Sequence, residues 1–259
     1  MSLFSLLLVV LLSTGCASNS TSRAGWSDVR QAASEAFMDR STWLPLVAAG
    51  VFAMNDYDEQ VTEWASEKTP LFGSTKRADD GSDRLSQLSH VTLAVSAMPS
   101  ISSLKEDGMW KSATATFKRL RPALGAHLVN IAFTQTSKDH INRERPDGEG
   151  SESFPSGHTS YSVVSAIQAS NLIDRMDIPQ ATKRNLRLAN YSVAGLSAWA
   201  RLEANRHYPS DVLTSFAVGN FAAGFVNRLL EKKMNDRNEL LFLDTNGNTG
   251  IRLTYAYAW

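Results

Sequence analysis

Three short segments of the chain carry the charged and nucleophilic side chains that could act on a phosphate group. They are residues 138–146, 155–158 and 201–211. The first and third segments contain the cations Lys138, Arg145 and Arg201. Phosphoryl transfer requires a protein mainly to position the phosphorus and to stabilise charge on its oxygens. Arginine can bind two such oxygens through its planar fork, and lysine supplies a point charge. We therefore predict that these three cations bind one phosphate group.

The second segment has the composition of a helix start that binds an anion. Ser156 is a favoured residue at the N-terminal cap of a helix, and Gly157 lets the backbone approach a ligand closely. Free N–H groups at a helix start attract negative charge. We expect the phosphate to lie on this turn, with His158 placed to donate a proton to the leaving oxygen. The alternative is an ordinary capped turn with a surface histidine.

His207 and Asp211 lie four residues apart, and Pro209 between them favours the first turn of a helix. At this spacing the carboxylate of Asp211 can accept a hydrogen bond from one ring nitrogen and leave the other nitrogen free to attack. We therefore predict that His207 is the nucleophile and that Asp211 orients it. Taken alone, the pair could also be the start of a helix with no chemical role.

The three segments, taken in order, resemble the signature of the type 2 phosphatidic acid phosphatase and vanadium haloperoxidase superfamily. The matching patterns are Lys-x6-Arg-Pro, Pro-Ser-Gly-His and Arg-x5-His-x3-Asp. The resemblance implies an all-α helical bundle, hydrolysis without a metal ion and a phosphohistidine intermediate. It assigns catalysis to His207, His158 and Asp211, and phosphate binding to Lys138, Arg145, Ser156, Gly157 and Arg201.

Two features depart from the usual pattern of the superfamily. Ala200 stands where a serine usually precedes the arginine of the third motif, which removes a hydroxyl group but no charge. Residues 147–154 form a short link between the first two motifs, so we expect no lid there. No group of histidine, cysteine and aspartate has the spacing of metal ligands. The sequence therefore predicts no metal ion and no other cofactor.

The composition limits the kind of partner. The chain has 26 Lys and Arg residues and 26 Asp and Glu residues, so its net charge is zero and no strong basic field exists to bind nucleic acid. The resemblance implies hydrolysis of a phosphate monoester or pyrophosphate, on a lipid or on a small phosphoester. Candidate lipids are phosphatidic acid, phosphatidylglycerophosphate, undecaprenyl pyrophosphate and lipid A. The alternatives are a vanadate-dependent haloperoxidase and an envelope lipoprotein that kept the fold without catalysis.

Hydrophobic periodicity predicts a series of helices that must position these segments. The predicted helices are residues 27–37, 43–54, 59–66, 84–102, 109–135, 159–174, 179–204 and 209–233. Residues 212–226 carry no charge, and small residues such as Gly219 permit close helix packing. We interpret this stretch as a buried central helix, with a membrane-embedded helix as the alternative.

The end of the chain has a different pattern. Leu253, Tyr255, Tyr257 and Trp259 alternate with smaller residues after a turn-rich segment, which predicts a β-hairpin packed on the helical body or on a partner. The sequence thus divides into a signal peptide at residues 1–17, a tether at 18–26, a helical phosphatase domain at 27–236 and a hairpin at 237–259. No feature predicts an oligomeric state.

The N-terminal residues predict export from the cytoplasm. Residues 3–12 are almost wholly apolar and small residues follow them, which is typical of a secretion signal, although a buried N-terminal helix is the alternative. Cys16 is the only cysteine, so no intramolecular disulfide can form. Leu12 to Cys16 resembles a bacterial lipobox, with Ser13 in an unusual place. We predict a periplasmic protein anchored to the outer or inner membrane by lipid on Cys16, with ordinary cleavage near Ala17 as the alternative.

Overall fold

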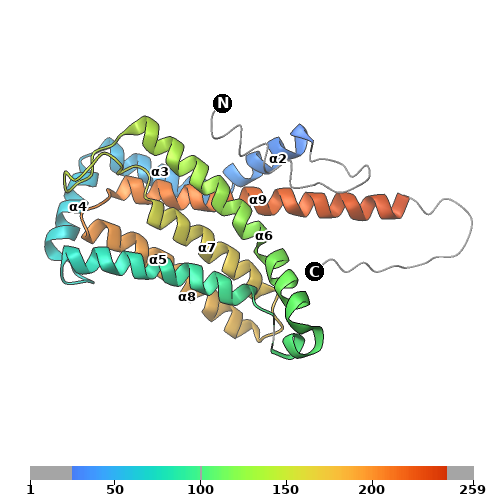
Figure 1. Cartoon of the computed structure of the whole chain (residues 1–259). Coiled ribbons are helices and arrows are strands. Elements are labelled where there is room, and N and C mark those ends of the chain that lie inside the picture. The colour runs from blue at the N-terminus through green and yellow to red at the C-terminus, as the bar shows by residue number, and fades with distance from the viewer. Residues whose placement is uncertain (1–24, 100, 244–259) are drawn as a thin grey trace, which may run out of the picture.

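The computed structural model describes residues 25–99 and 101–243, of which residues 101–108 and 233–243 are described by their backbone alone. Within these ranges the chain folds into eight α-helices and forms no strand (Figure 1). The helices are α2 (Trp26–Phe37), α3 (Arg40–Met54), α4 (Tyr57–Lys68), α5 (Thr75–Ala97), α6 (Ile101–Ile141), α7 (Gly157–Asp174), α8 (Gln180–Glu203) and α9 (Pro209–Leu243). The predicted all-α fold is confirmed.

Each helix that periodicity predicts overlaps a helix of the structure, and several are longer than predicted. The predicted helix at 84–102 ends earlier, at Ala97, and α6 begins at Ile101. Polar residues at helix ends carry no apolar period, so the sequence pattern misses them. Helix α5 begins at Thr75, well before residue 84, because Ser74 caps it by accepting a hydrogen bond from the backbone N–H of Arg77 at 3.2 Å. Helix α6 continues to Ile141, which places Lys138 in its last turn.

Helix α9 reaches Leu243, beyond the boundary at residue 236 that the sequence predicts for the helical domain. Residues 237–243 are therefore helical and do not start a hairpin. The remainder of the predicted hairpin, the predicted signal peptide and Cys16 lie outside the described residues. At the other end, α2 begins at Trp26, so the predicted tether overlaps the first helix by its last residue.

Helix α7 lies at the centre of the bundle, where it packs against α5, α6, α8 and α9 (Figure 1). One core cluster joins α7 to α6 and α9 through small and branched side chains: Ala126, Val164, Ala222, Ala223 and Val226. Small side chains let helix axes approach closely, and this is how a chain with few buried aromatic residues still excludes water from its centre.

The uncharged stretch of α9 is mostly buried against α7, as the sequence analysis predicts. Gly219 lies directly on α7, because a Cβ atom added there would lie 2.8 Å from Cγ1 of Val163 and 3.0 Å from the carbonyl oxygen of Ser160. Any larger residue would push the two helices apart. Among the described residues, no helix combines the length and the apolar character that a membrane span needs.

Candidate active site

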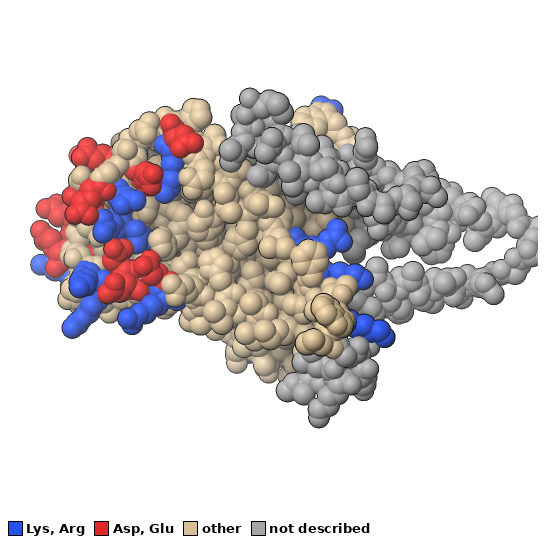
Figure 2. All heavy atoms as spheres, viewed as in Figure 1, with Lys and Arg blue, Asp and Glu red and all other residues tan. Residues whose placement is uncertain are grey.

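The predicted site residues come from helix ends and loops that meet at one end of the bundle (Figure 1). Charged side chains of both signs gather over this end of the molecule, at the left of Figure 2. The residues are Lys138 in the last turn of α6, Arg145 in the following loop, Ser156, Gly157 and His158 at the start of α7, Arg201 in the last turn of α8, His207 just before α9 and Asp211 in its first turn.

His207 is buried, and its ring is held in one orientation. Nδ1 donates a hydrogen bond to the backbone carbonyl oxygen of Ser153 at 2.5 Å. Because a carbonyl oxygen only accepts, the proton lies on Nδ1 and the lone pair of the neutral ring lies on Nε2. Burial lowers the pKa of His207 well below 6.5. Positive charges near the ring act in the same direction, namely those of Arg201, Lys138 and Arg145.

The structure corrects the predicted hydrogen bond between His207 and Asp211. Oδ2 of Asp211 lies 3.9 Å from Nδ1, because Nδ1 is bonded to the carbonyl of Ser153. Oδ2 instead accepts hydrogen bonds from the hydroxyl of Ser153 at 2.6 Å and from the backbone N–H of Tyr208 at 2.9 Å. Burial raises the pKa of Asp211 to about 6, although Arg143 and these donors lower it. Asp211 is thus connected to the ring of His207 through Ser153.

Arg143, which the sequence analysis does not single out, connects Asp211 to helix α4. Its Nη1 donates to Oδ1 of Asp211 at 2.6 Å, and its Nη2 donates to Oδ2 of Asp58, in the first turn of α4, at 2.8 Å. Asp58 also accepts from the backbone N–H of Ser210 at 2.8 Å. The guanidinium lies 4.1 Å from the ring centre of Tyr208. Two buried carboxylates around one arginine therefore fix the start of α9 against α4.

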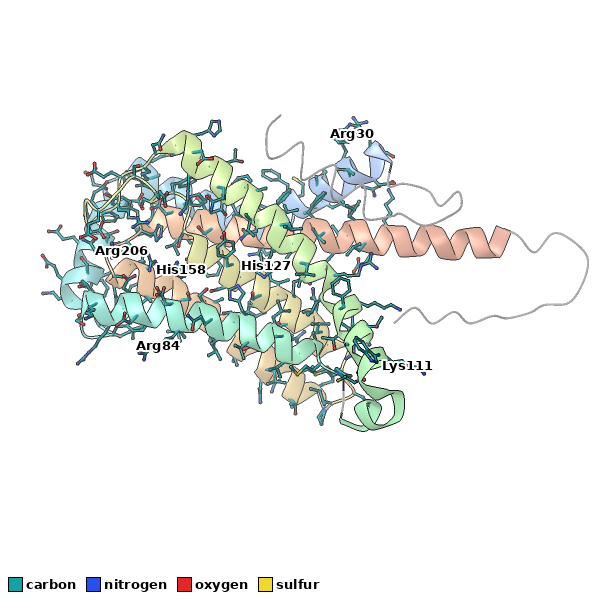
Figure 3. All side chains as sticks on the ribbon, in the orientation of Figure 1. Arg30, Arg84, Lys111, His127, His158 and Arg206 are labelled. Carbon is teal, nitrogen blue, oxygen red and sulfur yellow. The ribbon has the colours of Figure 1, made fainter. Side chains whose placement is uncertain are left out.

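His158 is partly exposed and pairs with an acidic residue of α5. Its Nε2 donates to Oδ1 of Asp83 at 2.8 Å. Burial lowers the pKa of His158 below 6.5, as does the charge of Arg201, whereas Asp83 raises it. The net effect lowers the pKa of His158, and a histidine beside a carboxylate can exchange a proton with a substrate. Figure 3 shows His158 at the start of α7, above α5.

Arg201 is buried and is also held by α5. Its Nη1 donates to Oδ1 of Asp79 at 2.5 Å and to the hydroxyl of Ser82 at 2.9 Å. Arg206 donates to Oδ2 of Asp79 at 3.2 Å and to Asp147 at 2.8 Å. Burial raises the pKa of Asp79, but the two arginines outweigh it and keep the pKa below its ordinary value. Asp79 therefore remains an anion that positions the Arg201 fork.

Lys138 and Arg145 share a carboxylate partner, Glu152. Its Oε2 lies 3.5 Å from Nζ of Lys138 and 3.9 Å from Nη2 of Arg145. The carboxylate of Glu152 thus occupies a position at which Lys138 and Arg145 could bind another anion. Within the described residues, the buried Nε groups of Arg145 and Arg201 have no hydrogen-bond partner. Unpaired buried donors cost free energy, and the oxygens of a bound phosphate would satisfy them.

The start of α7 also fits an anion. Ser156 occupies the N-cap position and is fully buried, but its hydroxyl does not cap the helix. It accepts a hydrogen bond from the hydroxyl of Thr159 at 3.1 Å instead. The first N–H groups of α7 therefore lack a side-chain partner and remain available to a phosphate. The predicted capping by the Ser156 side chain is therefore absent, and phosphate binding at this turn stays a prediction.

Sequence reasoning misses several residues that hold the site together: Asp58, Asp79, Asp83, Arg143 and Ser153. Asp79 and Asp83 carry a weak signal, since two acids four residues apart share one face of a helix. Across residues 25–99 and 101–243, no group of three or more His, Cys, Asp or Glu side chains could hold a metal ion. Hydrolysis without a metal ion remains a prediction.

Comparison with known proteins bears directly on this site. Residues 109–235 match the family model of the PAP2 superfamily. The chain carries a PAP2 superfamily domain. The matched region runs from α6 into α9 and includes all three motifs. It therefore contains His158 and His207, the two histidines predicted to be catalytic, and the three predicted phosphate-binding cations. The acidic partners on α4 and α5 lie outside the matched region.

The chain is also similar to a lipid A 1-phosphatase of Porphyromonas gingivalis. The two are 29% identical over 179 residues, which is 68% of this chain and 35% of the relative. The aligned part thus spans about a third of the length of that relative. No solved structure matches the chain. The PAP2 domain, the helical fold and the geometry of the site are therefore the basis for a proposed function.

Proposed function

We propose that the protein is a phosphatase that removes a phosphate group from a lipid through a phosphohistidine on His207. The observation that carries the proposal is the burial and fixed orientation of the His207 ring. The ring is buried, its Nδ1 proton is bound by the carbonyl of Ser153, and the positive charges of Arg201, Lys138 and Arg145 favour its neutral form. A neutral imidazole with one nitrogen fixed in this way is an activated nucleophile. The PAP2 domain supports the same chemistry.

In the first step of the proposed reaction, Nε2 of His207 attacks the phosphorus and the bond to the leaving oxygen breaks. His158 gives its proton to that oxygen, so an alcohol leaves. The guanidinium groups of Arg145 and Arg201 can accommodate the charge of the transferring group through their unpaired N–H donors. Glu152 must move aside, because its carboxylate faces the same cations as the phosphate would.

In the second step, a water molecule attacks the phosphorus of the phosphohistidine. His158, which is now neutral, accepts a proton from this water, and the bond between Nε2 and phosphorus breaks. Inorganic phosphate leaves and both histidines return to their first state. Ser153 keeps the His207 ring in place throughout, since its carbonyl accepts the same Nδ1 proton in each step.

The relative that is a lipid A 1-phosphatase supports a phosphorylated lipid as the substrate. The test is a phosphate-release assay on vesicle-borne lipid phosphates and on soluble phosphoesters. The His207→Ala variant should lose at least about 10³-fold in kcat, because no other group can form the intermediate. His140→Ala is the control, since His140 is exposed at the end of α6 and should leave activity unchanged.

Two results would contradict this proposal. One is turnover by the His207→Ala variant at a rate near that of the parent. The other is the lack of an acid-labile, alkali-stable phosphoenzyme when the parent is quenched during turnover of radiolabelled substrate, since a phosphohistidine has this stability. Preference for soluble phosphoesters over any lipid phosphate would leave the mechanism intact but would remove the lipid substrate.

We also propose that the enzyme acts outside the cytoplasm and is anchored by lipid on Cys16. The apolar segment at residues 3–12 and the lipobox-like residues before Cys16 support this location. Cells that express the chain and are fed labelled palmitate should yield labelled protein in the membrane fraction, and the Cys16→Ser variant should carry no label. Labelling of the Cys16→Ser variant would contradict the anchor.

A further inference from the structure

Two neighbouring helices present apolar side chains to solvent in regular rows. On α5 these side chains are Leu88, Val91, Val95 and Met98, and on α6 they are Trp110, Phe117, Leu124, Leu128 and Ile131. Each row repeats at intervals of three, four or seven residues, so it follows one face of its helix. Trp110 is 82% exposed, which is unusual for so large an apolar side chain. We call these two rows together the α5–α6 face.

The two rows belong to one surface of the molecule. Both helices pack on α7, and Leu93, Ala123 and Ala169 form a core cluster that joins the three helices below the surface. The rings of His90 on α5 and His127 on α6 stack with their centres 5.5 Å apart. Figure 2 shows this surface as a broad area without charge between the charged end and the cations at the opposite end.

The α5–α6 face begins at the active site. Ile131 lies seven residues before Lys138 on α6, which is about 10 Å along the helix. On α5, Leu88 follows Asp83 by five residues, and Asp83 binds the proposed general acid His158. A lipid whose phosphate lies at His207 would therefore have its acyl chains within reach of both rows.

From Met109 to Lys138 the charged residues of α6 are all of one sign. Between residues 109 and 138 this helix carries no aspartate or glutamate, and its exposed cations are Lys111, Lys118, Arg119 and Arg121. A helix with an apolar face flanked by cations is typical of proteins that lie on anionic membranes. A second copy of this chain would be a poor partner for the same face, because a two-fold contact would place these cations near one another.

We propose that the α5–α6 face lies on an anionic lipid surface and holds the active site at the level of the headgroups. Its apolar side chains enter the acyl region and its cations contact the lipid phosphates. This proposal rests on the proposed function, because it assumes a lipid substrate. It concerns binding of the protein to a lipid surface, which can be measured without any hydrolysis of substrate. It also gives a physical reason for large exposed apolar residues next to a polar site.

The test measures which face of the protein contacts a lipid vesicle. In the full chain with Cys16→Ser, a single new cysteine carries an environment-sensitive fluorophore. Val91→Cys on α5 is matched with Val47→Cys on α3, since these valines are 55% and 57% exposed. Leu124→Cys on α6 is matched with Leu44→Cys on α3, at 48% and 50%. Helix α3 packs on α9 and α4 and is not part of the α5–α6 face.

With phosphatidylglycerol vesicles, emission from labels at positions 91 and 124 should rise about twofold or more and should be quenched by nitroxide lipids. Labels at positions 47 and 44 should change little. An equal response on α3, or no response on α5 and α6, would overturn the proposal. The proposal would also be overturned if the labels on α5 and α6 emitted strongly without vesicles and this emission rose with protein concentration. That result would indicate a contact between two copies of the chain.

A charge reversal tests the role of the cations. Arg121→Glu should weaken binding of the labelled protein to phosphatidylglycerol vesicles by about tenfold. Arg30→Glu on α2 makes the same charge change at another exposed position and should have little effect (Figure 3). Equal weakening by both variants would overturn the specific role of α6. Any hydrolysis of a soluble phosphoester should be the same in both variants. Failure of the parent to hydrolyse both lipid and soluble phosphoesters would contradict only the proposed function.

Discussion

The pKa of His158 sets the pH range in which the proposed general acid carries its proton. Burial and Arg201 lower this pKa from 6.5, and Asp83 partly restores it. The proton is present below the pKa of the folded protein and is lost as pH rises through it. We therefore expect kcat/KM of the free enzyme to decline with rising pH in a range below 6.5. His207, whose pKa is lower still, limits activity only at more acidic pH.

Replacing Asp83 by asparagine should move this decline to lower pH, because the carboxylate that stabilises protonated His158 is removed. The maximal rate on the acidic side should stay within about twofold of the parent. The pH profile of kcat/KM on a soluble phosphoester measures the effect. Asp80→Asn is the control, since Asp80 is an exposed acid of the same helix and has no part in the pKa of His158. An unchanged or alkaline-shifted profile would contradict the role of Asp83.

Glu152 pairs with Lys138 and Arg145, the cations that are proposed to bind the phosphate, and would compete with it. Replacing it by glutamine should therefore lower the inhibition constant for inorganic phosphate by about two- to fivefold, a modest effect because Glu152 is largely exposed. Glu149→Gln is the matched control, because Glu149 is an exposed acid of the same loop that pairs with Arg206 at 2.9 Å. Weaker inhibition in Glu152→Gln would mean that Glu152 helps to bind phosphate.

Helices α4 and α9 are joined through Arg143, and this contact supports the proposed nucleophile His207 indirectly. Arg143 binds Asp58 on α4 and Asp211 on α9, and Asp211 in turn binds the hydroxyl of Ser153. The carbonyl of Ser153 then holds the ring of His207. Removing the arginine would leave two buried carboxylates without a cation, which is costly in a protein interior.

The Arg143→Met variant should therefore lose about 3 kcal/mol in free energy of unfolding and should also lose kcat as Ser153 shifts. Urea unfolding and a phosphatase assay measure the two effects. Arg187→Met is the control, since Arg187 pairs with Asp174 at 3.1 Å where both are about half exposed, and it should cost under about 1 kcal/mol. The proposed network would be contradicted by equal stability losses in the two variants.

The whole molecule is organised around α7, which is buried by four other helices and begins at the active site. Charged groups of both signs gather at one end of the bundle, and small residues fill its centre. The position of the phosphate-binding turn therefore depends on how closely α9 packs against α7. Gly219 allows this close packing, since an added Cβ would meet Val163 at 2.8 Å.

The Gly219→Ala variant should lose about 1 to 3 kcal/mol in free energy of unfolding, because the new methyl group has no space between α9 and α7. Gly195→Ala in α8 is the matched control. Nothing lies within 4 Å of a Cβ at that position, so the better helix propensity of alanine should add about 0.5 to 1 kcal/mol. Thermal or urea unfolding of both variants measures the difference. Stabilisation by Gly219→Ala would show that the two helices can separate without cost.

The sequence by itself determined the all-α fold of this protein and predicted its reacting groups. Periodic apolar residues predict each helix because an amphipathic helix must bury one face. The motif residues predict that His207, His158 and the three cations belong together, because phosphate chemistry requires these side chains in one place. Helix ends were less accurate, as at Thr75 and Leu243, because polar residues there carry no apolar pattern.

Only the tertiary structure decided what holds these groups in place. Asp58 lies 85 residues from Arg143 in the chain, and Asp79 lies 122 residues from Arg201, so no local spacing could indicate either pair. The orienting partner of His207 is a backbone carbonyl, which every residue possesses and which no sequence motif can mark. The α5–α6 face likewise exists only because α7 brings two helices together. Residue types and spacing specify the chemistry, whereas packing selects the partners, because a contact depends on distance in space.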